Sequence, residues 1–321
     1  MTRTCIRVFA LCLTISAATA WSQSSPSKPI RLIVAFAPGG GGDINARLYA
    51  PELTRLLGQP VIVENRPGAG TNLATEYVAR AAPDGHTLLV NSAAVVINMS
   101  LYKKVNYDTF RDLAAVSIFS ESPNILAVHP SLPAKTVSEL VALARAKPNA
   151  MNYSSGGSGT TQHLTGELFK LKTNTRIVHI PFKGSAPSLT ALLGGEVEMT
   201  FANLTAVSVY LKSGRLRALA TTGANRSARV PAVPTMKESG MPGIEVSVWF
   251  GALAPAATPP DVVSAIAAAI GRAARTPEIR QRLSEHGAEP GGNTPDEFAR
   301  ILKREYANWA QVIRASGATA E

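Results

Sequence analysis

The stretch Phe36-Ala37-Pro38-Gly39-Gly40-Gly41-Gly42-Asp43 decides how the first part of the chain folds. An apolar run over residues 30–35 precedes it and predicts a buried strand. An amphipathic pattern over residues 44–57 follows it and predicts a helix that ends at Gly58. A strand, a glycine turn and the start of a helix together leave backbone N–H groups without partners, an arrangement that suits an anion. The stretch therefore predicts an anion-binding turn.

The first twenty residues have the features of a cleavable signal peptide. Arg3 and Arg7 form a basic region, residues 8–18 form an apolar core, and Ala18-Thr19-Ala20 offers a cleavage site. A lipid anchor at Cys12 is not favoured, because the residue before it is not small. No later stretch reaches the roughly 18 uninterrupted apolar residues that a transmembrane helix needs. The sequence predicts a protein exported to the periplasm of a Gram-negative bacterium.

Composition excludes several classes of site. Both cysteines, Cys5 and Cys12, lie in the predicted signal peptide, so disulfides, thiolate catalysis and cysteine-ligated metals are not expected. The formal net charge of +10 becomes +8 once Arg3 and Arg7 are removed, which favours anionic ligands or surfaces, although solvated surface charge explains it equally well. Nucleic acid is not expected, because the basic residues are scattered and aromatic residues make up only 6%. The remaining residues can form a sizeable core divided into two lobes.

Strand-like runs alternate with helical patterns along most of the chain, which predicts an α/β protein with a largely parallel sheet in each lobe. The predicted strands cover residues 30–35, 60–63, 87–90, 115–119, 125–128, 151–153, 176–180, 198–201, 217–221 and 246–254. The predicted helices cover residues 44–57, 71–82, 137–146, 162–171, 186–193, 259–274 and 295–315. The last helix has a capping box, with Thr294 at the N-cap and Glu297 three residues on.

Four turns share one design, since each follows a predicted strand and opens a predicted helix. They cover residues 38–43, 65–71, 154–161 and 183–186. In open α/β sheets such turns gather at the carboxyl ends of the strands, where ligands bind. A hydrogen bond to a charged group contributes about 1.5–3 kcal/mol, so four or five of them would support roughly micromolar affinity. The turns therefore predict one anion site built by both lobes.

Nucleotide sites do not fit the glycine-rich turn. A dinucleotide fingerprint, G-x-G-x-x-G, fails because Ile44 or Asn45 occupies the position of its last glycine. A phosphate-binding P-loop would need Gly-Lys-Ser/Thr, which does not follow. Asp43 at the start of the helix would also repel a polyphosphate. A smaller anion remains the better occupant.

A hydrolase is the alternative from another class. Gly156-Gly157-Ser158-Gly159-Thr160 approaches the nucleophile motif G-x-S-x-G but ends in threonine, and His163, His179 or His286 could in principle serve Ser158 as base. A metal site is not predicted, because the pair His163 and Glu167 lacks a third ligand. Trp249 is expected in the core between the lobes.

Several motifs, in order along the chain, resemble the substrate-binding proteins of tripartite tricarboxylate transporters, the Bug family. The resemblance spans residues 29–317. It rests on Pro29-Ile30-Arg31-Leu32-Ile33-Val34, the opening glycine stretch, Glu64-Asn65-Arg66-Pro67-Gly68-Ala69-Gly70, Ala82-Pro83-Asp84-Gly85-His86-Thr87-Leu88-Leu89, Leu101-Tyr102-Lys103-Lys104, His129-Pro130-Ser131-Leu132-Pro133, Asn152-Tyr153-Ser154-Ser155-Gly156, Phe182-Lys183-Gly184-Ser185-Ala186-Pro187 and Gly251-Ala252-Leu253-Ala254-Pro255.

The resemblance implies a two-lobed, type II (Venus-flytrap) periplasmic-binding-protein fold that closes on a small carboxylate. It implies lobe I from residues 28–121 and 232–321 and lobe II from residues 122–231. It also implies a monomer without cofactor or catalysis that delivers its ligand to a permease of one large and one small membrane subunit. A sensor that docks on a membrane kinase would show the same features and stays an alternative. The implied ligand-binding residues are Phe36, Ala37, Gly39, Gly40, Asp43, Asn65, Ala69, Gly70, Ser92, Ser155, Gly156, Thr160, His163, Lys183, Gly184 and Asn203.

Two positions depart from the family pattern. Ala202 stands where an aspartate is usual, which suggests a less polar or purely carboxylate ligand. Thr71 stands where a further glycine is usual, which suggests a narrower pocket.

Overall fold

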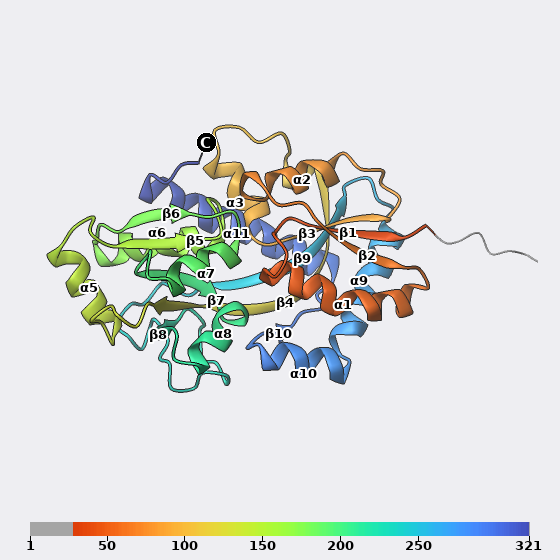
Figure 1. The fold of residues 1–321 in the computed structure, drawn as a ribbon. Coiled ribbons are helices and arrows are strands. Elements are labelled where there is room, and N and C mark those ends of the chain that lie inside the picture. Colours follow the sequence, from red (N-terminus) through yellow and green to blue (C-terminus); the bar gives the residue numbers. More distant parts are fainter. Residues whose placement is uncertain (1–27, 321) are drawn as a thin grey trace, which may run out of the picture.

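The computed structural model describes residues 28–320, and the predicted signal peptide lies outside them. The chain forms an elongated two-lobed α/β molecule (Figure 1). The long strand β4 (Leu113–Val128) belongs to the sheets of both lobes, so it joins them through the middle of the molecule. We name the lobes by their sheets: lobe I is built on the first sheet and lobe II on the second. The boundaries of the lobes within the sequence stay a prediction.

The sheet of lobe I is mixed. Its strands are β2 (Val61–Asn65), β1 (Ile30–Val34), β3 (Thr87–Asn91), β9 (Ser247–Pro255), the first part of β4, and the short β10 (Glu289–Pro290). β1 pairs in parallel with β2 and β3, whereas β9 runs antiparallel to both β3 and β4. The first three strands of lobe I are thus parallel to one another. β9 is antiparallel to both of its neighbours, β3 and β4.

The sheet of lobe II repeats this plan. Its strands are the second part of β4, β7 (Met199–Asn203), β5 (Asn152–Ser155), β6 (Val178–Pro181) and β8 (Arg217–Thr221). β5 is parallel to β6 and β7, whereas β7 and β8 are antiparallel to β4. The two-lobed α/β class is confirmed. The expectation of largely parallel sheets is wrong, because five of the nine strand pairs in the described residues are antiparallel: β3 with β9, and β4 with β7, β8, β9 and β10.

The region predicted as two strands, 115–119 and 125–128, is the single strand β4. Its middle contains Ser120, Glu121 and Ser122, a polar run that the sequence pattern takes for a break. These residues stay in the strand because β9 pairs with all three, with two register shifts nearby. Ser120 also donates its hydroxyl proton to Asn45 Oδ1 at 2.6 Å. The hydroxyl of Ser122 accepts from Asn203 Nδ2, so both serine side chains have hydrogen-bond partners inside the strand.

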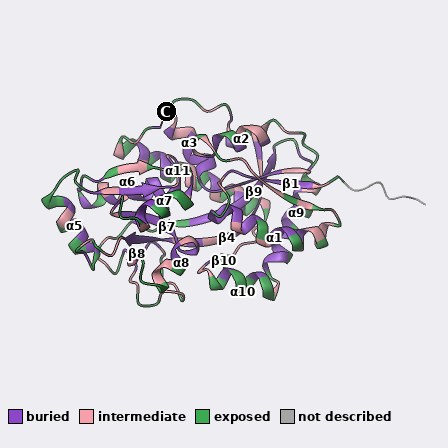
Figure 2. Cartoon of the chain, viewed as in Figure 1, coloured by how far each residue is buried: buried purple, intermediate pink, exposed green. Residues whose placement is uncertain are grey.

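Helices cover both faces of each sheet, with buried residues turned inward and exposed ones outward (Figure 2). The helices foreseen from the sequence are α1 (Gly41–Leu57), α2 (Asn72–Ala79), α5 (Val137–Ala146), α6 (Thr161–Thr173), α7 (Ser185–Leu193), α9 (Pro260–Ala274) and α11 (Pro295–Ser316). Those missed are η1 (Ala69–Thr71), α3 (Ala94–Leu101), α4 (Thr109–Asp112), α8 (Leu204–Lys212) and α10 (Pro277–Glu285). Helix α3 was missed because it is apolar nearly all round and so lacks a helical period.

The capping box of α11 forms as predicted, since Thr294 accepts from the Glu297 N–H and Glu297 accepts from the Thr294 N–H. Trp249 is buried and packs edge-on against Phe298 of α11, with ring centroids 5.0 Å apart. None of the helices in residues 28–320 combines the length and apolar character needed to cross a bilayer.

Candidate functional site

Two adjoining cavities lie between the lobes, where the predicted turns meet. The larger has a volume of about 190 Å³ and the smaller about 30 Å³. The larger is lined by Ala35, Phe36, Ala37, Pro67, Gly68, Ala69, Gly70, Thr71, Gly156, Gly157, Phe182, Lys183 and Gly184. The smaller is lined by Phe36, Gly41, Ser92, Asn124, Gly156, Thr160, Thr161, Gln162, Ser185, Asn203, Ala206, Val248 and Phe250. Phe36 and Gly156 line both, so they mark where the two cavities meet.

Helix starts from both lobes face these cavities. No side chain caps the start of α1 at Gly40, of α2 at Thr71 or of α7 at Gly184. Among the described residues, no protein acceptor bonds the N–H groups of residues 41–43 or 185–186. Helix N-termini carry partial positive charge, and their free N–H groups bind anions. Of these residues, Gly41 of lobe I and Ser185 of lobe II line the smaller cavity, so donors without a protein acceptor face it from both lobes.

Asp43 does not line either cavity, although the sequence places it at the site. Its carboxylate is buried and accepts hydrogen bonds from Arg47 Nε and the Gly39 N–H, both at 2.9 Å, and from Asn65 Nδ2 at 2.8 Å. Burial raises the pKa of Asp43, but these three donors more than offset it, so that the pKa lies below its ordinary value. Asp43 therefore holds the glycine turn in shape as a carboxylate.

Asn65 supports the same turn from the end of β2. Its Nδ2 also donates to the Phe36 carbonyl at 3.0 Å, and its Oδ1 accepts from Arg47 at 2.9 Å. Phe36 packs edge-on against Phe250, with ring centroids 5.6 Å apart. These contacts fix Phe36 at the boundary of the two cavities.

The turn of lobe II, residues 154–161, which we call the serine loop, is held by its own side chains. Thr160 donates its hydroxyl to the Gly157 carbonyl at 2.8 Å and accepts from the His163 N–H. Gln162 Oε1 accepts from the Gly156 N–H at 2.6 Å, and the Gly184 N–H reaches the Gly156 carbonyl at 3.1 Å. The last contact ties the serine loop to the start of α7.

The predicted site residues divide into two groups. Those that line a cavity are Phe36, Ala37, Ala69, Gly70, Ser92, Gly156, Thr160, Lys183, Gly184 and Asn203. Those that do not line either cavity are Gly39, Gly40, Asp43, Asn65, Ser155 and His163. Asn203 lines the smaller cavity with its side chain already engaged, because Oδ1 caps α8 through the Thr205 N–H and Nδ2 donates to Ser122. Direct ligand contact by any of these residues stays a prediction.

Sequence reasoning missed part of the lining. Thr161, Gln162 and Ser185 lie within or directly beside the predicted turns, so their position was a signal for them. Asn124 and Phe250 come from the middle strands β4 and β9. Trp249, which was expected in the core, does not line either cavity. Successive residues of a strand face opposite sides, so its neighbour Phe250 faces the smaller cavity instead.

The structure gives the hydrolase alternative no support at Ser158. Within residues 28–320, no histidine hydrogen-bonds the Ser158 hydroxyl, and His179 Nε2 bonds Ser155 Oγ at 2.7 Å instead. Among the same residues, no group of three or more metal-ligating side chains gathers.

The two departures from the family pattern lie in different surroundings. Ala202 does not line either cavity and packs in an apolar cluster with Ile125 and Leu204, so an aspartate here would point away from the cavities. Thr71 does line the larger cavity, with a left-handed φ of 87° that is unusual for a β-branched residue. The effect of either residue on selectivity stays a prediction.

Known proteins resemble this chain over nearly its whole length. The model of the tripartite tricarboxylate transporter family receptor matches residues 45–318. The protein BugT of Bordetella pertussis is 38% identical over 304 residues, which cover 94% of this chain and 93% of BugT. A structure of R. palustris Rpa4515 with adipate has a TM-score of 0.88 at 36% identity and covers 92% of this chain and 99% of that one. A structure of MatC from Rhodopseudomonas palustris with bound malate has a TM-score of 0.86 at 32% identity and covers 90% of this chain and 99% of that one.

Proposed function

The chain belongs to the tripartite tricarboxylate transporter family of receptors, and on that premise we propose that it captures a small organic carboxylate between its two lobes. In this proposal it works in the periplasm, without cofactor or catalysis, and delivers the ligand to the large and small membrane subunits of a permease. Relatives of the same fold were solved with adipate and with malate, which supports the ligand class.

One observation carries the proposal. The two cavities are lined by uncapped helix starts from both lobes and by no acidic side chain, and Lys183 is the one charged residue among their lining residues. A carboxylate placed there would accept from free N–H groups, each bond contributing about 1.5–3 kcal/mol. A neutral ligand would leave those donors without a charged partner.

Thermal unfolding in the presence of ligands tests the proposal. Adipate, malate and benzoate are each added to the purified protein at up to millimolar concentration, with the neutral adipamide as the matched control. A ligand at 100 times its Kd adds about 2.7 kcal/mol to the free energy of unfolding, so we expect at least one acid to raise Tm by several degrees and adipamide to leave it unchanged. Equal shifts with acid and amide would contradict carboxylate recognition.

Lys183 is expected to favour dicarboxylates over monocarboxylates. Its side chain is exposed at the larger cavity and makes no hydrogen bond or ion pair with another described residue. A second carboxylate reaching it would gain about 1.4 kcal/mol, a tenfold effect on Kd. We expect Lys183→Met to weaken adipate about tenfold and benzoate hardly at all, as measured by calorimetry. Lys212→Met, at the end of α8 and away from both cavities, is the control.

A further inference from the structure

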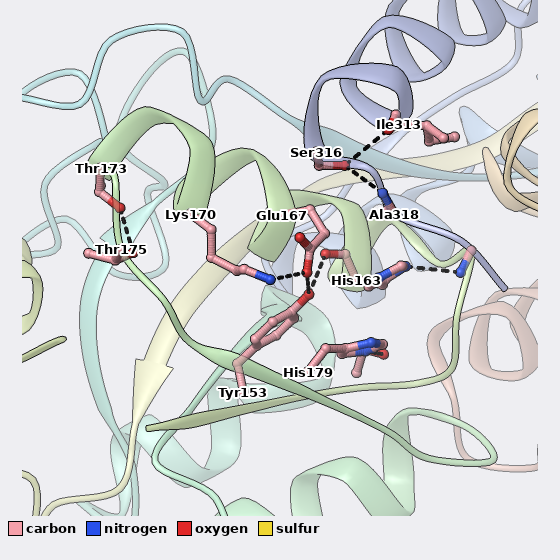
Figure 3. Close-up of polar contacts among 12 residues, drawn as sticks. Tyr153, His163, Glu167, Lys170, Thr173, Thr175, His179, Ile313, Ser316 and Ala318 are labelled. Atoms are coloured by element: carbon pink, nitrogen blue, oxygen red, sulfur yellow. Dashed lines mark hydrogen bonds and ion pairs between the residues drawn. The ribbon is translucent and has the colours of Figure 1, made fainter. Parts of the chain in front are cut away.

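Two histidines stack behind the serine loop, out of the cavities. The rings of His163 from α6 and His179 from β6 lie 4.1 Å apart at 18°, and the ring of Tyr153 from β5 also stacks with His179, with centroids 4.8 Å apart (Figure 3). His163 is buried, with 4% of its surface exposed. Stacked imidazole rings at this distance are compatible with neutral rings and not with two positive charges.

Each ring holds one end of the serine loop. His163 Nδ1 accepts a hydrogen bond from the Gly159 N–H at 3.2 Å, so Nδ1 carries no proton in this arrangement. His179 Nε2 bonds Ser155 Oγ at 2.7 Å, and the same oxygen lies 3.2 Å from the Gly157 nitrogen. Protonation of His163 at Nδ1 would place a donor against the Gly159 donor and break that contact.

The serine loop links these rings to both the ligand cavities and lobe I. Gly156 and Gly157 line the larger cavity. On the other side, a Cβ built on Gly159 would overlap Asn98 Oδ1 of α3, and one built on Gly70 would meet the Ser158 carbonyl. The backbone of the serine loop is therefore in direct contact with lobe I, and a small shift of the loop would alter the contact and the cavity together.

The charged groups around the two histidine rings would not neutralise the positive charge that a proton adds to them. On α6, Glu167 Oε1 is already paired with Lys170 Nζ at 2.8 Å and with the Tyr153 hydroxyl at 2.7 Å. Helix α3, which faces the loop, carries no charged residue. Burial lowers the pKa of His163 to about 4 and that of His179 to about 3. The positive charge of Lys170 lowers both pKa values further, whereas the carboxylate of Glu167 raises that of His163.

We propose that His163 and His179 are positioning residues for ligand capture: as a neutral stacked pair they hold the serine loop in the shape that lines the cavities and meets lobe I. This inference rests on the proposed function and adds a dependence on acidity to it. Protonation of His163 breaks its hydrogen bond with the Gly159 N–H, and a positive charge on either ring disfavours the stack, so the serine loop is no longer held in the shape that lines the cavities.

Affinity as a function of pH tests the role. Calorimetry with adipate and malate between pH 7.5 and 4.0 compares the wild type with the double variant His163→Asn, His179→Gln. The Asn oxygen can replace Nδ1 and the Gln amide can replace Nε2, and neither titrates. Because burial lowers the pKa of His163 to about 4, about half of the wild-type molecules carry the proton at pH 4.0, so we expect the wild type to lose about twofold more affinity than the double variant over this range. Protonation of the ligand affects both proteins equally. His286→Gln, at the residue that directly follows α10, should behave as the wild type.

Hydrogen exchange of residues 154–161 in the ligand-free protein provides a readout that does not need a ligand. We expect exchange to be faster in the wild type than in the double variant at pH 4.5 and equal at pH 7.5. Binding of neither acid at pH 7.5 would count against the proposed function, and the exchange experiment would then decide the histidine role alone. Identical pH profiles of the wild type and the double variant in exchange, or in affinity where binding occurs, would overturn it.

Discussion

Replacing Gly159 by alanine is expected to weaken ligand binding by between about 10- and 100-fold while the protein still folds. Gly159 has a left-handed φ of 83°, and a methyl group there would overlap Asn98 Oδ1 and press on Leu101, both in lobe I. Overpacking of this kind costs about 1–3 kcal/mol. The cost falls on the state in which the lobes touch, which is the state that encloses a ligand. Calorimetry with a carboxylate that binds the wild type measures it.

Gly58→Ala is the matched control. Gly58 ends α1 with a left-handed φ of 68°, and nothing lies within 4 Å of a Cβ built on it. Both variants place an alanine in the left-handed region, which costs about 1–2 kcal/mol of stability wherever it occurs. Gly58→Ala should therefore lose a similar amount of stability and no affinity. If the two variants bound equally well, the contact between Gly159 and Asn98 would not matter for capture.

The positions of the turns could be predicted from the sequence, because their cause is local. Glycines between an apolar run and an amphipathic pattern leave few structures open, and the residues after β1, β2, β5 and β6 do lie beside the two cavities. The capping box at Thr294 was predictable for the same reason. Features that depend on a few neighbouring residues, such as these turns and the cap, could therefore be predicted.

The direction of the polar side chains could not be predicted, because it depends on partners far away in the sequence. Asp43 turns from the cavity toward Arg47 and Asn65, and His163 turns toward Gly159 and His179. The position of Asn124 in the lining of the smaller cavity could not be predicted for a related reason. It lies in β4, whose continuity depends on pairing with β9, more than a hundred residues later. Local sequence thus predicted which turns lie at the cavities, and tertiary pairing decided which side chains line them.

Stability is expected to fall steeply as the solution is acidified from about pH 6.5 to pH 4. The folded-state pKa of His163 is lowered by burial from 6.5 to about 4, and that of His179 to about 3. As the pH falls through 6.5 the unfolded chain takes up protons at these rings and the folded chain does not, so the free energy of unfolding decreases. At about 1.36 kcal/mol for each pKa unit, His163 alone accounts for a loss of roughly 3 kcal/mol at pH 4. His179 acts in the same direction.

Other groups titrate in the same acidic pH range, and the experiment has to separate their contribution to stability from that of the two histidines. Burial raises the pKa of Glu121 and of Glu305, so their protonation favours the folded state as the pH falls and partly offsets the loss. Asp84, with a pKa lowered to about 2 by Lys28, adds a loss only below its ordinary value of 3.8. Denaturant unfolding of the wild type and of the double variant His163→Asn, His179→Gln at pH 7.5, 5.5 and 4.5 removes these contributions by difference. The difference in unfolding free energy between the two proteins should shift by several kcal/mol in favour of the variant from pH 7.5 to 4.5. A constant difference would mean that both rings titrate alike in the folded and unfolded chains, and that the serine loop is held without them.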